Sequence, residues 1–358
     1  MAATSVRAQG DGGFTVRNGD SGLFLPATLK DRAVDGIFDC GCSRTVIDSG
    51  TAKAFGIVAV DQVDARFVYA KGKMGVAGPT RMTIAGQAFT ISPYISALRA
   101  AGLDCDMLVG MDVWKAVTFD LDGPGLRGRL LPVDAAPAPG MASVSIDNNG
   151  SDIIWAPLLI EGKSTTAQLD TGSGTALTLS RDAATALGLI DGRPLSQWIS
   201  GDLTGIYNID MTSVKEMNFG GVVFRDMPVE ISDHHATSEI SIGLPILLRC
   251  RTRWDMAHNR LWLAADTTQA ALSFERERAG LAYLPDKDRL NVLFVAPGSP
   301  AAKAGWKTGD VIIAIDGVTI ADLDPETLLD WKHDPSRTSV RLTVAGGEVR
   351  TLALAAYY

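Results

Sequence analysis

The chain has 358 residues, which suggests two to three domains at about 150 residues per domain. Hydrophobic residues make up 46% and charged residues 21%, so the composition excludes a disordered chain and is ordinary for a globular one. The net charge of −8 argues against a sequence-independent nucleic-acid binder, which needs basic patches, and no uncharged apolar run approaches the ~18 residues of a membrane span.

The first pattern along the chain occurs twice. Residues 24–41 and 155–172 each run from an aromatic residue through a proline to an Asp-x-Gly, and the proline precedes the aspartate by 13 residues in both. Each segment then leads through a short apolar strand into an Ala-rich stretch that predicts a helix, at residues 51–55 and 181–187. The other runs are short, β-branched and bounded by Gly, Asp and Asn, which predicts a mostly β structure.

The two segments also resemble each other further along the chain, at similar distances from their aspartates. Gly110 closes an apolar run 71 residues after Asp39, and Gly243 closes a similar run 73 residues after Asp170. This agreement in spacing indicates two copies of one unit of about 120 residues. The expected units are residues 14–133 and 141–266.

Two aspartates are the candidates for chemistry. Asp39 and Asp170 each end an apolar strand, where a turn must follow, so the two carboxyls can meet between the copies. Like charges that lie close together share one proton, which supplies one base and one acid around a single water. Such a pair hydrolyses an amide without a covalent intermediate. Gly41 and Gly172 let the two aspartate loops turn tightly and approach each other. Three other aspartates are expected to be turn or surface carboxylates: Asp48, Asp104 and Asp106.

The duplicated Asp-x-Gly, each copy with its later Gly motif, resembles the retropepsin-like and pepsin-like aspartic proteases over residues 14–266. The resemblance implies a bilobal acid-protease β fold whose Asp39 and Asp170 activate the lytic water. It implies that Thr171 donates a hydrogen bond across the lobe interface and that Ser173 hydrogen-bonds the catalytic carboxylate. It also implies that a monomer holds the whole site and that neither a metal nor an organic cofactor is needed.

The first copy departs from the family pattern at two positions. Cys40 stands where the family has Thr, and Cys42 stands at the Ser position. A thiol is a weak hydrogen-bond donor, so we expect a lopsided interlobe contact, and we expect Asp170 to ionise more readily than Asp39. The four cysteines, which include Cys105 and Cys250, are too few for a disulfide framework, and Cys40 and Cys42 are expected to be free thiols.

Members of that family cover the cleft with a β-hairpin. The candidate hairpins here are residues 68–76 in the first copy and 199–205 in the second. The residues expected at the cleft are Tyr69, Gly72, Trp198 and Gly201. A surface hairpin whose aromatic residue packs sideways is the alternative for both copies.

The last predicted unit, residues 279–358, contains the run Gly-Ser-Pro-Ala-Ala-Lys-Ala-Gly-x-x-x-Gly-Asp-Val-Ile followed by Ile-Asp-Gly. This run resembles a PDZ domain, and a helix is expected at residues 325–332. Such domains bind an extended peptide as an added strand and hold its C-terminal carboxylate with backbone N–H groups. The expected carboxylate loop is Ala279, Gly280, Leu281 and Ala282. A spacer domain with a closed groove is the alternative, and the chain's own end, residues 354–358, is a candidate ligand.

The sequence therefore predicts an aspartic endopeptidase, active at acid to near-neutral pH, whose PDZ domain recruits or regulates the peptide or protein substrate. Two alternatives stay open: a catalytically degenerate scaffold that binds peptides, and a zymogen that cleaves itself. The PDZ-tethered arrangement resembles bacterial envelope proteolysis and implies an extracytoplasmic location, with a cytoplasmic one as the alternative. Residues 1–9 lack the apolar region of an intact signal peptide.

Overall fold

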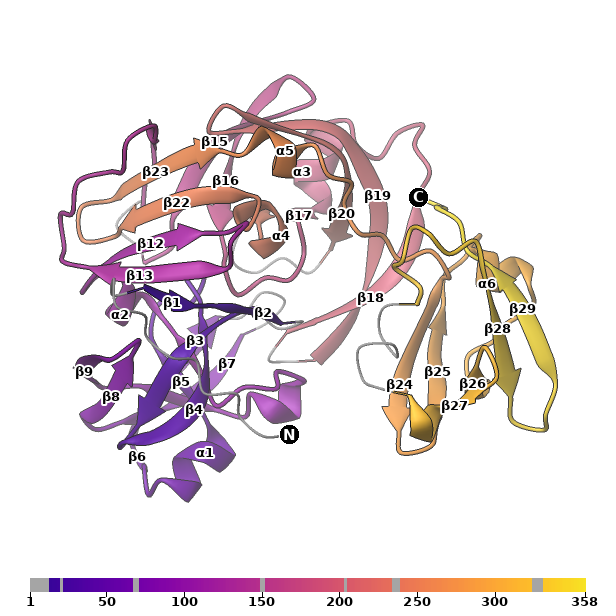
Figure 1. The fold of residues 1–358 in the computed structure, drawn as a ribbon, viewed down its shortest axis with the longest axis horizontal. Coiled ribbons are helices and arrows are strands. Elements are labelled where there is room, and N and C mark those ends of the chain that lie inside the picture. The colour runs from indigo at the N-terminus through magenta and orange to yellow at the C-terminus, as the bar shows by residue number, and fades with distance from the viewer. Residues whose placement is uncertain are drawn as a thin grey trace.

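The computed structural model is mostly β, as the sequence predicts, and its described residues form four sheets (Figure 1). It describes residues 13–19, 22–66, 71–148, 152–202, 205–233, 239–323 and 331–358. Within these ranges, no helix is long and apolar enough to cross a membrane. One sheet belongs to each lobe, a third joins the lobes, and the fourth forms the C-terminal unit.

The first lobe is built on a sheet with the strand order β6-β7-β10-β5-β11-β4-β3-β8-β9, and β2 pairs with β3 beside this path. Its strands are β2 (Arg17–Gly19), β3 (Gly22–Leu29), β4 (Arg32–Phe38), β5 (Val46–Asp48), β6 (Ala59–Arg66), β7 (Lys71–Ala77), β8 (Thr80–Ile84), β9 (Gln87–Ile91), β10 (Tyr94–Ser96) and β11 (Met107–Val109). Its helical segments are α1 (Ser49–Ala54), η1 (Arg99–Ala101) and α2 (Met111–Trp114). The helix predicted at residues 51–55 overlaps α1.

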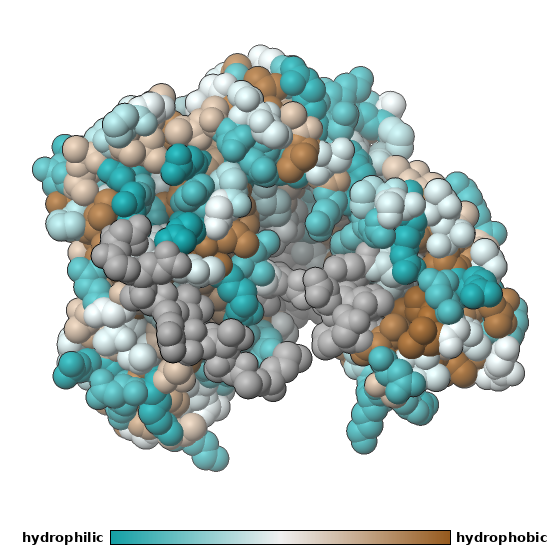
Figure 2. Space-filling model, in the orientation of Figure 1, coloured by the Kyte–Doolittle hydropathy of each residue, from teal (hydrophilic) through white to brown (hydrophobic). Residues whose placement is uncertain are grey.

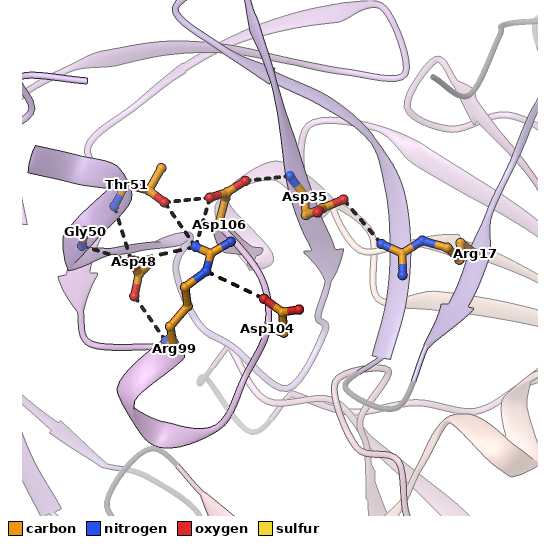
Figure 3. A network of polar contacts seen from close by, with 8 residues as sticks. All are labelled: Arg17, Asp35, Asp48, Gly50, Thr51, Arg99, Asp104 and Asp106. Carbon is orange, nitrogen blue, oxygen red and sulfur yellow. Dashed lines mark hydrogen bonds and ion pairs between the residues drawn. The ribbon is translucent and has the colours of Figure 1, made fainter. Parts of the chain in front are cut away.

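A polar network holds α1 against this sheet (Figure 3). The Asp48 carboxylate caps the helix and accepts a hydrogen bond from Thr51 N–H at 3.2 Å. Asp106 accepts one from Thr51 Oγ1 at 2.6 Å and pairs with the Arg99 guanidinium at 3.0 Å. Asp104 is exposed as expected, but Asp48 is buried and Asp106 half-buried, because both satisfy groups inside the lobe. The expectation of turn or surface carboxylates is therefore corrected for these two residues.

The second lobe repeats the plan with the strand order β15-β16-β21-β17-β20-β19-β18. Its strands are β15 (Trp155–Ile160), β16 (Lys163–Leu169), β17 (Leu177–Ser180), β18 (Ser196–Asp202), β19 (Gly205–Phe219), β20 (Val222–Ser232) and β21 (Ile240–Ile242). Its helices are α3 (Arg181–Ala186) and α4 (Leu244–Leu247), and α5 (Thr267–Ala270) follows the lobe. The helix predicted at residues 181–187 coincides with α3, and Ser180 caps it through a hydrogen bond from Ala183 N–H at 3.0 Å.

The third sheet, in the order β1-β13-β12-β22-β23-β14, takes strands from both lobes. These strands are β1 (Gly13–Thr15), β12 (Thr118–Asp122), β13 (Arg127–Leu131), β14 (Ala142–Val144), β22 (Cys250–Asp255) and β23 (Arg260–Ala265). The central pair, β12 and β22, is antiparallel and sets Phe119 opposite Trp254, two residues at matching places in the sequence repeat. The two copies therefore meet at a pseudo-twofold.

An aromatic cluster fills the core below this meeting point. Phe38 stacks on Trp114 with ring centroids 4.0 Å apart and meets Phe119 edge-on at 4.8 Å, and Trp114 contacts Trp254 at 5.5 Å. All four rings are fully buried. Because Phe38 directly precedes Asp39, the core holds the chain in place where the first candidate catalytic loop begins.

The C-terminal unit has a sheet in the order β24-β25-β26-β28-β29, with β27 beside β26, and a separate hydrophobic core. Its elements are β24 (Leu281–Asp286), β25 (Arg289–Val295), α6 (Pro300–Lys303), β26 (Val311–Ile315), β27 (Val318–Thr319), η2 (Ile320–Asp322), β28 (Ser339–Val344) and β29 (Val349–Ala353). Most of the helix predicted at residues 325–332 lies outside the described residues. Figure 2 shows hydrophobic side chains gathered on this unit, at the right of the view.

Candidate active site

Each candidate aspartate directly follows a strand that is paired in parallel with the strand of the later Gly motif. Asp39 follows β4, which pairs with β11, and Asp39 N–H donates to Val109 O at 3.0 Å. Asp170 follows β16, which pairs with β21, and Asp170 N–H donates to Ile242 O at 2.9 Å. The spacing that repeats in the sequence thus corresponds to the same geometry in both lobes. In each lobe, the strand that ends at the Gly motif pairs with the strand that ends at the aspartate and holds it in place.

The two carboxyls face each other across the lobe interface. Gly41 N–H donates to Asp39 Oδ1 at 2.8 Å, and Gly172 N–H donates to Asp170 Oδ1 at 2.9 Å. A Cβ added to Gly41 would lie 2.5 Å from Cγ of Asp170, and one added to Gly172 would lie 2.4 Å from Cγ of Asp39. Glycine is required at both positions because each loop lies against the carboxyl of the opposite lobe.

Burial and proximity shift the pKa of both carboxyls. Burial raises the pKa of Asp39, and the neighbouring Asp170 carboxyl raises it further, to well above its usual range. Burial also raises the pKa of Asp170, but N–H donors of its own loop and the Asp39 carboxyl lower it in turn. Two buried carboxyls in contact favour holding one proton between them, and the assignment of that proton to Asp39 stays a prediction from the sequence.

Cys40 and Thr171 tie the lobes together beneath the dyad. Thr171 Oγ1 accepts a hydrogen bond from Cys40 N–H at 3.0 Å and donates one to Phe38 O at 2.6 Å. Cys40 Sγ accepts one from Thr171 N–H at 3.4 Å and donates one to Leu169 O at 3.3 Å. The expectation of a lopsided contact between the lobes is therefore corrected. The Cys40 sulfur both accepts and donates a hydrogen bond, as a hydroxyl would, at the longer distances that its size requires. A thiol is still the weaker donor of the two groups.

The side chains of Cys42 and Ser173 form hydrogen bonds with backbone groups of their own loops. Cys42 Sγ donates to Arg44 O at 2.9 Å, and Ser173 Oγ accepts a hydrogen bond from Thr175 N–H at 3.3 Å. It is the backbone N–H groups of Cys42 and Ser173 that stabilise the ionised carboxylates. Replacing Ser by Cys at position 42 therefore leaves this support of Asp39 in place. All four cysteines are free thiols, as the sequence predicts for Cys40 and Cys42.

Glu230 contacts the loop of Asp170, and the sequence pattern does not reveal this contact. It lies on β20, and its two carboxylate oxygens accept hydrogen bonds from Thr175 Oγ1 at 2.9 Å and Ser200 Oγ at 3.1 Å. Burial raises its pKa. Thr175 belongs to the loop of Asp170 and Ser200 to strand β18, so Glu230 joins the second aspartate loop to the β18–β19 hairpin.

The two predicted cleft glycines each lie in a β-hairpin of their lobe. Gly72 pairs with Ala65 in the β6–β7 hairpin, whereas Tyr69 lies outside the described residues. Gly201 pairs with Ile206 in the β18–β19 hairpin.

Trp198 of that second hairpin contacts the C-terminal unit. Its ring meets Phe294 edge-on at a centroid distance of 6.2 Å, and Lys332 Nζ lies 5.3 Å from the ring centroid. Ser196 Oγ in the same strand donates to Pro297 O at 3.2 Å. A position over the dyad would require the Trp198 ring to leave these contacts.

The predicted carboxylate loop lies at the start of the edge strand β24. Leu281 and Ala282 pair with Val295 and Phe294 of β25. The N–H groups of Ala279 and Gly280 precede the strand, and both donate to the side chain of Glu277.

Two family models match parts of the chain. Residues 156–246 match the aspartyl protease family, and residues 292–346 match the PDZ domain family. A 39-residue segment is 49% identical to part of a protein of Synechocystis sp. named "Putative serine protease HhoA". That similarity covers 11% of this chain and 10% of the relative. The chain therefore carries a protease-like domain, which includes Asp170, and a peptide-binding type of domain behind it.

Proposed function

We propose that the chain is an aspartic endopeptidase of the bilobal, pepsin-like arrangement, acting as a monomer with a PDZ domain that recruits or regulates the substrate. The observation that carries the proposal is the facing pair of carboxyls, each against the glycine of the opposite loop. We extend the proposal to an extracytoplasmic location, which rests on the analogy with envelope proteolysis alone.

The proposed reaction uses the two carboxyls as base and acid. Asp170 accepts a proton from water as the water oxygen attacks the peptide carbonyl carbon, while Asp39 donates its proton to the carbonyl oxygen. Collapse of this tetrahedral intermediate breaks the C–N bond. The amine leaves with the proton from Asp170, and a hydroxyl proton returns to Asp39. Both residues thus recover their starting states without a covalent intermediate.

The protein matched over 39 residues is named a serine protease, so a serine mechanism is the competing chemistry. A serine mechanism requires a histidine base beside the nucleophile. Of the histidines that the structure describes, His258 Nδ1 lies 2.8 Å from Asp255 in the sheet between the lobes. The other, His333, is in the C-terminal unit, where burial and the adjacent Lys332 lower its pKa to about 4. The proposal of an aspartic mechanism therefore rests on the facing carboxyls of Asp39 and Asp170.

The experiment that separates the two mechanisms is an intact-mass measurement on reactions quenched with acid during cleavage of a peptide library. Direct attack by water predicts cleavage with no added mass on the protein. An acyl adduct on a serine would overturn the aspartic mechanism, and peptide binding without any cleavage would favour the scaffold alternative.

A further inference from the structure

A carboxylate of the chain itself occupies the loop that is expected to receive a peptide's carboxylate. The N–H groups of Ala279 and Gly280, here called the carboxylate nest, donate to Glu277 Oε1 at 3.1 Å and Oε2 at 2.6 Å. Tyr357 Oη donates to the same Oε2 at 2.9 Å. Glu277 is only 8% exposed, so its side chain fills the nest and shields it from solvent.

Lys332 lies against strand β24, next to the nest. Its Nζ donates to Leu281 O at 3.3 Å and lies 4.8 Å from the centroid of the Tyr283 ring. The Glu277 carboxylate attracts this ammonium group. Among the described strands, β24 pairs with β25 alone, so its other edge is the place where a peptide strand would add. Lys332 already uses a carbonyl of this strand.

The backbone around Glu277 is fixed from two sides. Arg278 N–H donates to Lys332 O at 3.1 Å, and Ala355 N–H donates to Arg278 O at 3.1 Å. The Arg278 guanidinium binds further carbonyl oxygens, among them Leu354 O at 3.1 Å. The segment before β24 is therefore held at the mouth of the nest, and Glu277 needs only a side-chain movement to leave it.

Residues 354–358 lie over this arrangement, and the hydrogen bonds that they form with Arg276 and Glu277 are outside the nest. The backbone oxygen of Tyr358 accepts a hydrogen bond from Arg276 at 3.1 Å, outside the loop of Ala279 and Gly280. Tyr357 reaches Glu277 through its hydroxyl. The candidate ligand at residues 354–358 thus acts as a cover over Glu277, and Glu277 itself is the occupant.

We propose that Glu277 is an intramolecular ligand of the PDZ carboxylate nest, which a peptide with a free C-terminal carboxylate must displace in order to bind. A peptide carboxylate offers the nest the same acceptor atoms that Glu277 offers, and it would meet the same Lys332 ammonium. The proposal rests on the proposed recruiting role of the PDZ domain and adds that the groove of the resting chain is closed by its own side chain.

The test is a fluorescence-anisotropy titration with labelled peptides that end in a free carboxylate, beside the same peptides ending in an amide. The full chain carries Asp170→Asn throughout, so that binding is measured without cleavage and independently of the proposed protease activity. Glu277→Gln and Glu277→Ala are compared with Glu275→Gln, a matched change at an exposed neighbour. Thermal unfolding of each variant verifies that it is folded.

The proposal predicts that Glu277→Ala tightens binding of free-carboxylate peptides about tenfold or more, with Glu277→Gln intermediate. The amidated peptides and Glu275→Gln should show no gain. Tyr357→Phe, which removes one donor and leaves Glu277 in place, should give a smaller gain and serves if the Glu277 variants do not fold. Equal affinity across all variants, or no binding by any of them, would overturn the proposal.

Discussion

Thr171 N–H donates a hydrogen bond to Cys40 Sγ at 3.4 Å, and Cys40 N–H donates one to Thr171 Oγ1 at 3.0 Å. The pair therefore links the lobes reciprocally, although one partner is a thiol. Both side chains are fully buried, so every donor and acceptor here depends on the other lobe for its partner. Burial also raises the pKa of the Cys40 thiol, which keeps the sulfur protonated and able to donate.

Thr171→Val is expected to destabilise the fold, because it removes the hydroxyl and leaves buried Cys40 N–H and Phe38 O without that partner. The loss in the free energy of unfolding should be about 1–3 kcal/mol, measured by denaturant titration. Thr166→Val on the exposed face of the same strand, β16, is the control and should change stability little. Equal stability of the two variants would contradict the assigned role of Thr171.

In Asp39→Asn, the free energy of unfolding is expected to decrease less with rising pH than it does in the wild type. A carboxyl whose pKa is raised in the folded state binds more protons there than in the unfolded state. Its contribution to the free energy of unfolding is therefore fully present below its ordinary pKa of 3.8 and is lost as pH rises through the folded-state pKa. Relative to Asp39→Asn, the wild type should therefore lose free energy of unfolding as pH rises above about 4. Asp182→Asn, at an exposed position, should keep the wild-type slope. Parallel slopes in all three proteins would show that the pKa of Asp39 is not raised.

Gly41→Ala should abolish most activity while the chain remains folded. The added Cβ would lie 2.5 Å from Cγ of Asp170, so the carboxyl must move, and a displacement of this kind costs about 100-fold in kcat/KM. Gly78→Ala is the matched control, because a Cβ at Gly78 meets nothing within 4 Å. Peptide cleavage rates measure the effect, and wild-type kinetics in Gly41→Ala would exclude a close approach of the two loops.

Trp198→Ala should free the β18–β19 hairpin from the PDZ domain, because it removes the ring that contacts Phe294 and Lys332. Faster hydrogen exchange of residues 196–202 is the expected result. Leu284→Ala, an exposed change on β24, should leave exchange in the hairpin unaltered. Unchanged exchange in Trp198→Ala would mean that these contacts do not hold the hairpin.

The sequence was sufficient for the parts of the molecule that depend on local order and repetition. Asp39 and Asp170 end apolar strands at matched spacings from Gly110 and Gly243, and the structure brings both pairs to equivalent places. The predicted helices at residues 51–55 and 181–187 have caps and Ala-rich faces. The single-turn helices α2 and α4 escaped prediction because four residues are too few to show a helical period.

The rest depends on partners far apart in the chain. Glu277 lies between the predicted units that end at residue 266 and begin at residue 279, and its role depends on Tyr357, 80 residues later, and on Lys332. Glu230 looks like any polar residue of a strand until Thr175 and Ser200 are seen on either side. No local pattern marks a side chain whose role is set by such contacts.

The most direct test of the proposed mechanism is cleavage of a peptide library from about pH 3 to 8 by the wild type, Asp39→Asn, Asp170→Asn and the control Asp182→Asn. Asp39 and Asp170 act as one unit, so each of their variants should lose cleavage by 10³-fold or more, about the scale of losing a catalytic pair member, while Asp182→Asn keeps the wild-type rate and cleavage sites. Wild-type cleavage that survives in both dyad variants would contradict the account, because the lytic water would then be activated elsewhere.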